Sequence, residues 1–154
     1  MIAIIDYGVG NLFSLRSSFA AIGAEVIVTA DKEVLEKVRK ASLLGRMKAP
    51  LAIVVCGNLS RALPLKMATY WIQDCSAATE NILLEATHLG LGSVWLGVCP
   101  NEERMNNLKE IFNLTDDYFA FSIVVIGYPK KEVIKERKYD ETLVHYNKLN
   151  NKYE

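Results

Sequence analysis

The side chains best suited to nucleophilic chemistry are three cysteines, Cys56, Cys75 and Cys99. A cysteine nucleophile sits on a tight turn between a strand and a helix and needs a histidine as its base. Cys56 and Cys99 each end an expected strand near a glycine, but neither stands in a G-x-C-x-G pattern. The two histidines, His88 and His145, fall in an expected helix and in the C-terminal tail. We therefore expect the cysteines to be small buried apolar groups, and we assign no catalytic side chain.

Two glycines near the start of the chain could bind a phosphate group. Gly8 and Gly10 follow an apolar run and precede a helical pattern, a setting in which backbone N–H groups can face an anion. The dinucleotide fingerprint G-x-G-x-x-G would require glycine at position 13, where the chain has Phe13. We interpret both glycines as parts of a tight turn, and Asp6 as a turn or cap residue. Flavodoxin-like phosphate binding at residues 8–11 is the weaker alternative.

The composition excludes several classes of protein. The chain has 154 residues, of which 51% are hydrophobic, enough for one compact domain. Its 18 basic and 18 acidic side chains balance, so no nucleic acid or anionic membrane is expected as a partner. No apolar run approaches the roughly 20 residues that span a bilayer, and the apolar start lacks the basic residues of a signal peptide. An odd number of cysteines without a C-x-x-C pair predicts a reduced, cytoplasmic protein.

The first thirty residues have a βαβ pattern. The apolar run at 2–5 stops at Asp-Tyr-Gly and predicts a buried strand. Apolar side chains at helical spacing predict a helix at 11–23, and the β-branched stretch 25–29 predicts a second strand. A βαβ unit implies parallel strands joined by a right-handed crossover. We expect the first strand to dock at the edge of the sheet, beside the second.

Strands and helices alternate in the rest of the chain. The expected elements are a helix at 31–40, a strand at 51–57, a long helix at 74–89 capped by Asp74, a strand at 93–98, a helix capped by Asn101 and a strand at 118–127. Residues 59–72 are ambiguous, because Pro64 favours a loop or a broken helix. In the polar tail, Val144 and Tyr146 alternate like a strand, so we expect the tail to lie across another surface.

Residues from about 26 to 148 resemble the flavin-dependent nitroreductase family. The resemblance rests on APLAIVVCGN, WIQDCSAATENILLEATHLGLGSVWLGVCPNEER, FSIVVIGYP and the tail KERKYDETLVHYN. It implies an α+β fold with a mixed, mostly antiparallel sheet flanked by helices. It also implies FMN at the interface of a homodimer whose subunits exchange their tails. Ala77 and Leu84, on a second small or apolar face of the long helix, suit burial in that dimer.

The same resemblance implies the flavin contacts. It places backbone groups of Leu96 and Gly97 at the N5 and O4 edge of the isoalloxazine, with Trp95 as a possible wall of the pocket. It places Lys135 and Arg137 of the tail on the phosphate. Such a protein would be an NAD(P)H-dependent oxidoreductase that acts on nitroaromatics, quinones or related small aromatic acceptors.

The opening residues, about 1 to 30, resemble a different family. The pattern MIAIIDYGxGN followed by GAEVxVT is similar to the start of the glutamine amidotransferase subunit of imidazole glycerol phosphate synthase. We therefore interpret the chain as a hybrid within one domain, 1–154. A foreign βαβ start (1–30) precedes a nitroreductase-like core (31–129) and an extended tail (130–154). The first strand would take the place that the partner's tail usually occupies, and glutaminase activity is not predicted.

Two segments by which the nitroreductase family holds its flavin do not occur in this sequence. They are an initial Arg-Ser-x-Arg and a later Pro-Ser-x-x-Asn-x-Gln-Pro-Trp. Each lost charge-assisted hydrogen bond would weaken binding by roughly 1.5–3 kcal/mol. Two functions therefore stay open: an FMN-binding oxidoreductase, or a catalytically inactive hybrid or truncated relative without bound flavin.

Overall fold

The backbone of the computed structural model is built around one five-stranded sheet. The structure describes residues 2–6, 21, 26–29, 31–41, 49, 51–130 and 139–149. The strands are β1 (Ile2–Asp6), β2 (Val26–Thr29), β3 (Leu51–Asn58), β4 (Gly92–Gly97) and β5 (Tyr118–Gly127). The α-helices are α2 (Lys32–Ala41), α3 (Trp71–His88) and α4 (Glu102–Ile111).

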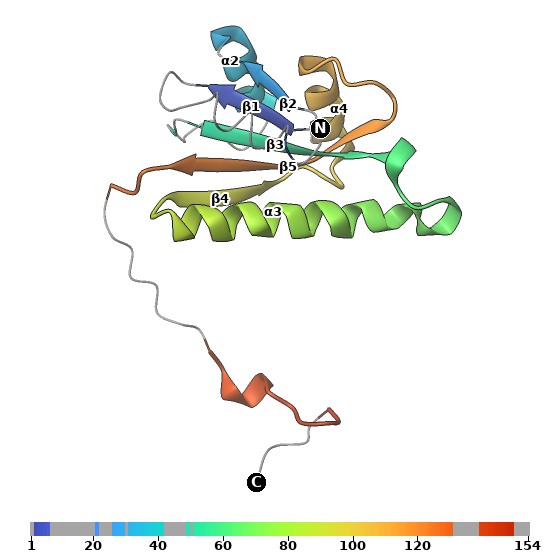
Figure 1. The fold of residues 1–154 in the computed structure, drawn as a ribbon, viewed down its shortest axis with the longest axis vertical. Coiled ribbons are helices and arrows are strands. Elements are labelled where there is room, and N and C mark those ends of the chain that lie inside the picture. Colours follow the sequence, from blue (N-terminus) through green and yellow to red (C-terminus); the bar gives the residue numbers. More distant parts are fainter. Residues whose placement is uncertain are drawn as a thin grey trace.

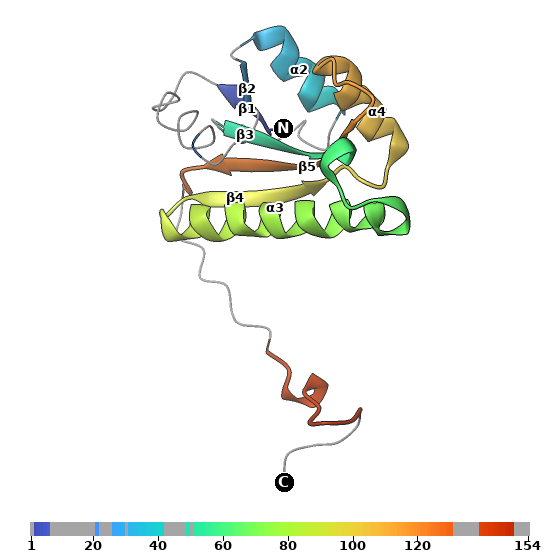
Figure 2. The same ribbon diagram turned by 45° about the vertical axis from the view of Figure 1, so that its right-hand side comes forward.

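The sheet has helices on both of its faces. The strand order is β2-β1-β3-β5-β4. Helix α3 runs along one face beneath β4 and β5, and α2 and α4 cover the other face (Figures 1 and 2). Only the β1–β2 pair is parallel among the described strands, while β1–β3, β3–β5 and β4–β5 are antiparallel. The predicted α+β class with a mixed, mostly antiparallel sheet is confirmed.

Strand β1 lies inside the sheet. Its parallel pairing with β2, in which Ile2 lies opposite Val26, confirms the predicted orientation. The predicted edge position is wrong, because β1 also pairs antiparallel with β3 and β2 forms the edge. A run of four apolar residues indicates a strand that is covered on both faces, but it does not say whether one strand or two pair with it. Apart from residue 21, which is helical, the predicted helix at 11–23 and its crossover lie outside the described residues, as do Gly8 and Gly10.

Two apolar layers fill the space between the sheet and the helices. Even-numbered side chains of β3, such as Val54, face α2 and α4, where they pack with Val38 and Leu108. Odd-numbered side chains of β3, such as Val55, face α3 and pack with Ala86. This alternation is what a strand with two covered faces requires. Strand β3 is therefore buried on both sides along most of its length.

A β-bulge in β5 turns two consecutive side chains toward α3. Val55 lies opposite Ser122 and the next residue, Cys56, lies opposite Ala120, so Phe121 is the extra residue. The Phe121 ring packs against aromatic rings on the α3 side of the sheet. The neighbouring Ser122 hydroxyl also meets α3, through a hydrogen bond to a threonine. The bulge therefore fixes the contact between β5 and the long helix.

The long helix α3 begins three residues earlier than predicted. A 3-10 helix at Leu65–Tyr70 leads directly into Trp71, and Tyr70 already has helical backbone angles. An extended cap residue is therefore not required, and Asp74 lies in the first turn instead of capping the helix. The expected break at Pro64 is confirmed, since Pro64 is extended and precedes this 3-10 helix.

Helix α4 begins at the predicted residue, whereas the structure of the tail differs from the prediction. Asn101 is extended and its Oδ1 accepts a hydrogen bond of 2.9 Å from the Arg104 N–H, which confirms the predicted cap. In the tail, Asp140 caps a single 3-10 turn at Glu141–Leu143. The expected strand at Val144 is wrong, because residues 139–149 form no strand and lie apart from the sheet (Figures 1 and 2). A strand needs a partner edge, and this segment does not reach one.

None of the helices in the described part of the chain is both long and apolar enough to cross a bilayer. The same residues contain no cluster of three or more histidine, cysteine or acidic side chains that could hold a metal ion.

Candidate functional site

Among the described strands, β4 pairs with β5 alone. The alternation of hydrogen bonds along this pair decides which backbone groups of β4 face outward. The Val98 N–H donates to the Phe121 carbonyl over 3.2 Å. In an antiparallel pair, alternate residues turn both N–H and C=O toward the partner strand. Leu96 is therefore directed to β5, whereas Trp95 and Gly97 turn their backbone groups to the open edge.

Gly97 lies at the end of this open edge. It is exposed, and a Cβ built on it would meet no atom within 4 Å. Its carbonyl oxygen accepts a hydrogen bond of 3.0 Å from Nη1 of Arg104, in the first turn of α4. This bond agrees with the phase of the pairing, because it shows the Gly97 carbonyl directed away from β5.

The side chains of the two preceding residues lie on opposite faces of the sheet. Leu96 is buried among the residues that face α2 and α4. Trp95 is half-buried on the α3 side, with its ring centroid 5.7 Å from that of Phe121. Both side chains therefore hold β4 against the body of the protein. The open edge itself consists of backbone.

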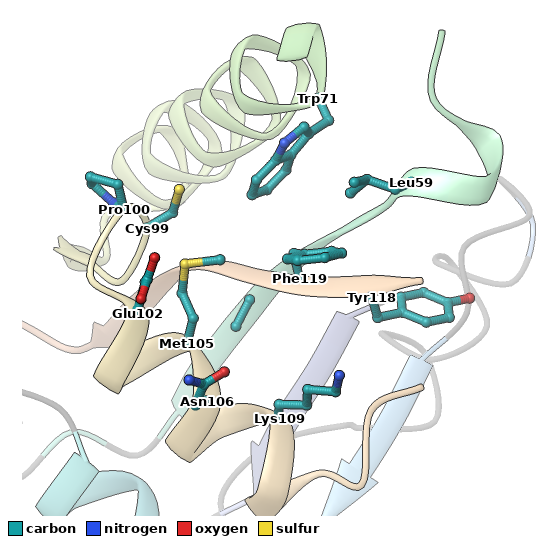
Figure 3. A pocket seen from close by; sticks show the side chains of 11 residues that line it. Leu59, Trp71, Cys99, Pro100, Glu102, Met105, Asn106, Lys109, Tyr118 and Phe119 are labelled. Carbon is teal, nitrogen blue, oxygen red and sulfur yellow. The ribbon is translucent and has the colours of Figure 1, made fainter. Parts of the chain in front are cut away.

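A cavity of about 510 Å³ begins two residues beyond Gly97 (Figure 3). It lies between the start of α3, the start of β5 and helix α4. Its lining residues are Leu59, Trp71, Cys99, Pro100, Glu102, Met105, Asn106, Lys109, Tyr118, Phe119 and Ala120. The Trp71 indole projects into the cavity from α3, and the ring of Phe119 lies below it (Figure 3). Most of the lining is thus aromatic or apolar, a surface that suits a flat organic molecule.

One ion pair stands at the polar side of the cavity. Nζ of Lys109 lies 2.6 Å from Oδ1 of Asp116. The hydrogen bond from Lys109 and its charge hold the pKa of the Asp116 carboxyl below its usual range. Because the Asp116 side chain is fully exposed, this pair contributes little to stability and leaves the lysine at the mouth of the cavity.

The cysteines do not form a nucleophilic site. Cys56 and Cys75 are buried, as predicted, and Cys99 is half-buried. Burial raises the pKa of Cys56 to about 12 and that of Cys75 to about 11. Burial also raises the pKa of Cys99, which lines the cavity. All three are therefore protonated thiols at neutral pH, the unreactive form.

The structure brings together only part of the predicted site. Trp95, Leu96 and Gly97 are contiguous on β4, whereas Lys135 and Arg137 lie outside the described residues. Sequence reasoning did not find Arg104 or Trp71. Arg104 stands three residues after the Asn101 cap, but nothing in the sequence indicates that its side chain contacts the preceding strand.

Comparison with known proteins connects this geometry to a family. The model described as "Nitroreductase family" matches residues 17–128. A relative from Archaeoglobus fulgidus, provisionally named an NADH dehydrogenase/NAD(P)H nitroreductase, is 52% identical over 110 residues, covering 69% of this chain and 61% of that protein. A similarly named relative from Methanothermobacter thermautotrophicus is 38% identical, with 63% of its length covered. The chain thus spans less than two thirds of the length of these two relatives.

Solved structures are similar over most of the chain. A protein from Clostridium acetobutylicum, provisionally named an NADH oxidase, has a TM-score of 0.69 and 40% identity, covering 78% of this chain and 72% of that one. A protein from Clostridium difficile R20291, named an FMN-dependent nitroreductase, has a TM-score of 0.64 and 28% identity, with 78% and 72% covered.

A shorter similarity joins the chain to a second family. Imidazole glycerol phosphate synthase subunit HisH of Methanothermobacter thermautotrophicus is 58% identical over 36 residues. This match covers 23% of the present chain and 18% of that protein. It supports a resemblance of one short stretch.

Proposed function

Since this chain belongs to the nitroreductase family, we propose that it binds FMN and transfers electrons from NAD(P)H to a small aromatic acceptor. FMN, when bound, supplies the hydride chemistry. The observation that carries the proposal is the open edge of β4 at Gly97, where the backbone faces outward and a Cβ would meet open space. A flat ring can approach backbone N–H groups closely at such a position.

Each predicted site residue has a role in this proposal. The outward N–H of Gly97 can donate to an acceptor atom of the ring, as can that of Trp95 two residues earlier. Leu96 contributes by anchoring the strand, through its pairing with β5 and its buried side chain. We propose Lys135 and Arg137 as partners of the phosphate, since paired cations suit a phosphate group.

The aromatic cavity supports a small aromatic acceptor. Trp71 and Phe119 line it, and its lining at Cys99 and Pro100 follows directly on the β4 edge. An acceptor ring that stacks over the flavin could extend into this space. Residues Trp71 and Phe119 would exclude water and orient the acceptor, and no side chain acts as an acid or base in this proposal.

We also propose that the protein is a homodimer. The face of α3 that points away from the sheet exposes Leu84 by 59%, and Leu89 just beyond the helix is exposed by 62%. Ala77 and Ile72 are exposed on the same helix. Apolar side chains in this number suit burial against a second copy. We propose that the two copies exchange their tails, as the family resemblance implies. Light scattering should give twice the 17.2 kDa mass of one chain.

The test of flavin binding is direct. Purified protein should be yellow, should release FMN on denaturation, and should take up added FMN. The Gly97→Ala variant should bind FMN roughly tenfold more weakly, about 1.4 kcal/mol, because its methyl group occupies the space above the strand. Gly92→Ala is the matched control at the other end of β4, where a Cβ would make ordinary contacts of 3.5 Å or more. Equal affinities in both variants would contradict the proposed position of the flavin.

The second candidate is a catalytically inactive hybrid without flavin. The short similarity to subunit HisH favours it, because a borrowed N-terminal segment would stand where the family's flavin-binding segments are expected. Colourless protein that takes up no added FMN at millimolar concentration would establish this alternative.

A further inference from the structure

Arg104 is held in place at both ends. Its backbone N–H donates to Oδ1 of the Asn101 cap over 2.9 Å, and its Nη1 donates to the Gly97 carbonyl over 3.0 Å. The side chain is half-buried. It therefore spans from the first turn of α4 to the open edge of β4 with little freedom to move.

This contact changes the chemical character of the open edge. An outward-facing strand residue presents one donor and one acceptor. At Gly97 the carbonyl already accepts a hydrogen bond from Arg104. The groups that a ligand can still meet are the Gly97 N–H and the other N–H groups of the guanidinium. A guanidinium has five N–H donors and stays charged at any physiological pH. The end of β4 therefore presents donors and a positive charge.

The described part of the chain offers no ion-pair partner for Arg104, although Glu102 and Glu103 precede it in the same turn. Both glutamates are exposed to solvent. A half-buried cation beside an open strand edge attracts a ligand that carries electron-rich acceptor atoms or gains negative charge.

We propose that Arg104 is a positioning residue for the flavin. Its guanidinium holds the Gly97 peptide and supplies a positive charge that favours the reduced ring. This inference rests on the proposed FMN function. Two-electron reduction adds a hydride and leaves the ring with more negative charge on its carbonyl side. A fixed cation at the strand edge stabilises that charge and so raises the reduction potential of bound FMN.

The experiment compares three substitutions at this position. Arg104→Gln and Arg104→Met remove the charge, and Arg104→Lys keeps it without the planar fork. FMN affinity is measured by fluorescence quenching, and the midpoint potential of bound FMN by spectroscopic titration against reference dyes. Arg61→Gln, which removes a different arginine of the 3-10 helix at Leu59–Arg61, is the control.

Neutral substitution should lower the midpoint potential, and lysine should restore it. We expect Arg104→Gln and Arg104→Met to disfavour reduced over oxidised FMN by about tenfold, which is about 30 mV for two electrons. Arg104→Lys and Arg61→Gln should keep the wild-type potential. Using two neutral variants keeps the test valid if one of them fails to fold.

Two outcomes would overturn the inference while leaving the proposed function intact. In the first, all variants bind FMN with the wild-type potential. In the second, the midpoint potential of Arg104→Lys falls as far as that of the neutral variants. The charge would then not set the potential, and Arg104 would only bind the Gly97 carbonyl. If the wild-type protein takes up no FMN, the proposed function fails first and the inference fails with it.

Discussion

Gly57 and Gly97 stand in strands of the same sheet, yet their surroundings are opposite. A Cβ on Gly57 would lie 2.4 Å from the ring of Trp71, so the chain itself fills the space beside β3. A Cβ on Gly97 would meet nothing within 4 Å. The centre of the sheet is thus completed by its own side chains, while the edge at β4 offers space and outward backbone groups. Folding and ligand binding therefore depend on different strands of one sheet.

The largest effect should come from the ring that joins these two regions. Phe121 is buried, and its ring centroid lies 6.0 Å from that of Trp71 and 5.7 Å from that of Trp95. Phe121→Ala should lower the free energy of unfolding by about 3–5 kcal/mol, measured by urea denaturation. Tyr128→Ala, at a residue that is 79% exposed, should change it by less than about 0.5 kcal/mol. Equal losses would show that the aromatic cluster is not a packing centre.

The two glycines allow the comparison itself to be tested. Gly57→Ala should lower the free energy of unfolding by about 1–3 kcal/mol, because the Trp71 ring must move toward the cavity it lines. Gly97→Ala should leave stability within about 0.5 kcal/mol of the wild type. Chemical denaturation of both variants without added flavin measures this difference. Similar stabilities for the two variants would remove the distinction between a closed centre and an open edge.

Local chemistry was enough to predict several elements of the fold. The Asn101 cap, the break at Pro64 and the limits of β5 each depend on residues close in sequence. The interior position of β1 and the extra residue at Phe121 depend on pairing between distant strands. No local pattern contains that information, so both escaped prediction.

The candidate site, too, could be predicted only in part from the sequence. Resemblance to a family placed the backbone of both Leu96 and Gly97 at the flavin edge, with Trp95 as a possible wall, but it did not distinguish which residues of the strand turn their backbone groups outward. That distinction needs the phase of pairing with β5, which the Val98 hydrogen bond to β5 fixes. Arg104 was missed because its role is a contact between a helix side chain and a strand carbonyl, and a lone arginine carries no such signal.

Alkaline pH should weaken the closed centre more than the edge. Burial raises the pKa of Cys56 to about 12, while an unfolded thiol titrates near 9. The protonated Cys56 thiol therefore contributes its full share to the free energy of unfolding below pH 9. This contribution is lost as the pH rises from 9 toward 12, because the thiol loses its proton first in the unfolded state. At pH 10 this loss should be about 1.4 kcal/mol. Denaturation at pH 8 and pH 10 should show a larger loss in the wild type than in Cys56→Ala, where Cys75, whose pKa burial raises to about 11, still contributes.

Cys99 provides the comparison at the edge of the sheet. Water reaches this half-buried thiol, so replacing it with alanine should alter the pH dependence less than Cys56→Ala does. The same pH dependence in wild type and Cys56→Ala would contradict the assignment, since other groups would then account for alkaline destabilisation.

The smallest effect concerns a pair of hydroxyls between α3 and β5. Thr79 and Ser122 are fully buried, and their oxygens lie 2.9 Å apart. The Thr79 hydroxyl donates its one proton to the Cys75 carbonyl over 2.7 Å, so Ser122 must be the donor of the bond between the two. Thr79→Val would leave a buried donor without an acceptor, while Ser122→Ala removes the donor and leaves Thr79 still bonded.

The two single substitutions should therefore differ in cost. Thr79→Val should destabilise more than Ser122→Ala, because an unsatisfied buried donor carries its full desolvation penalty. The double variant should be less destabilised than the sum of the singles, with a coupling energy of about 1 kcal/mol in urea denaturation. Additive losses would mean that the two hydroxyls act independently. The same cycle measured with FMN present should give the same coupling energy, because this bond belongs to the centre of the sheet and not to its open edge.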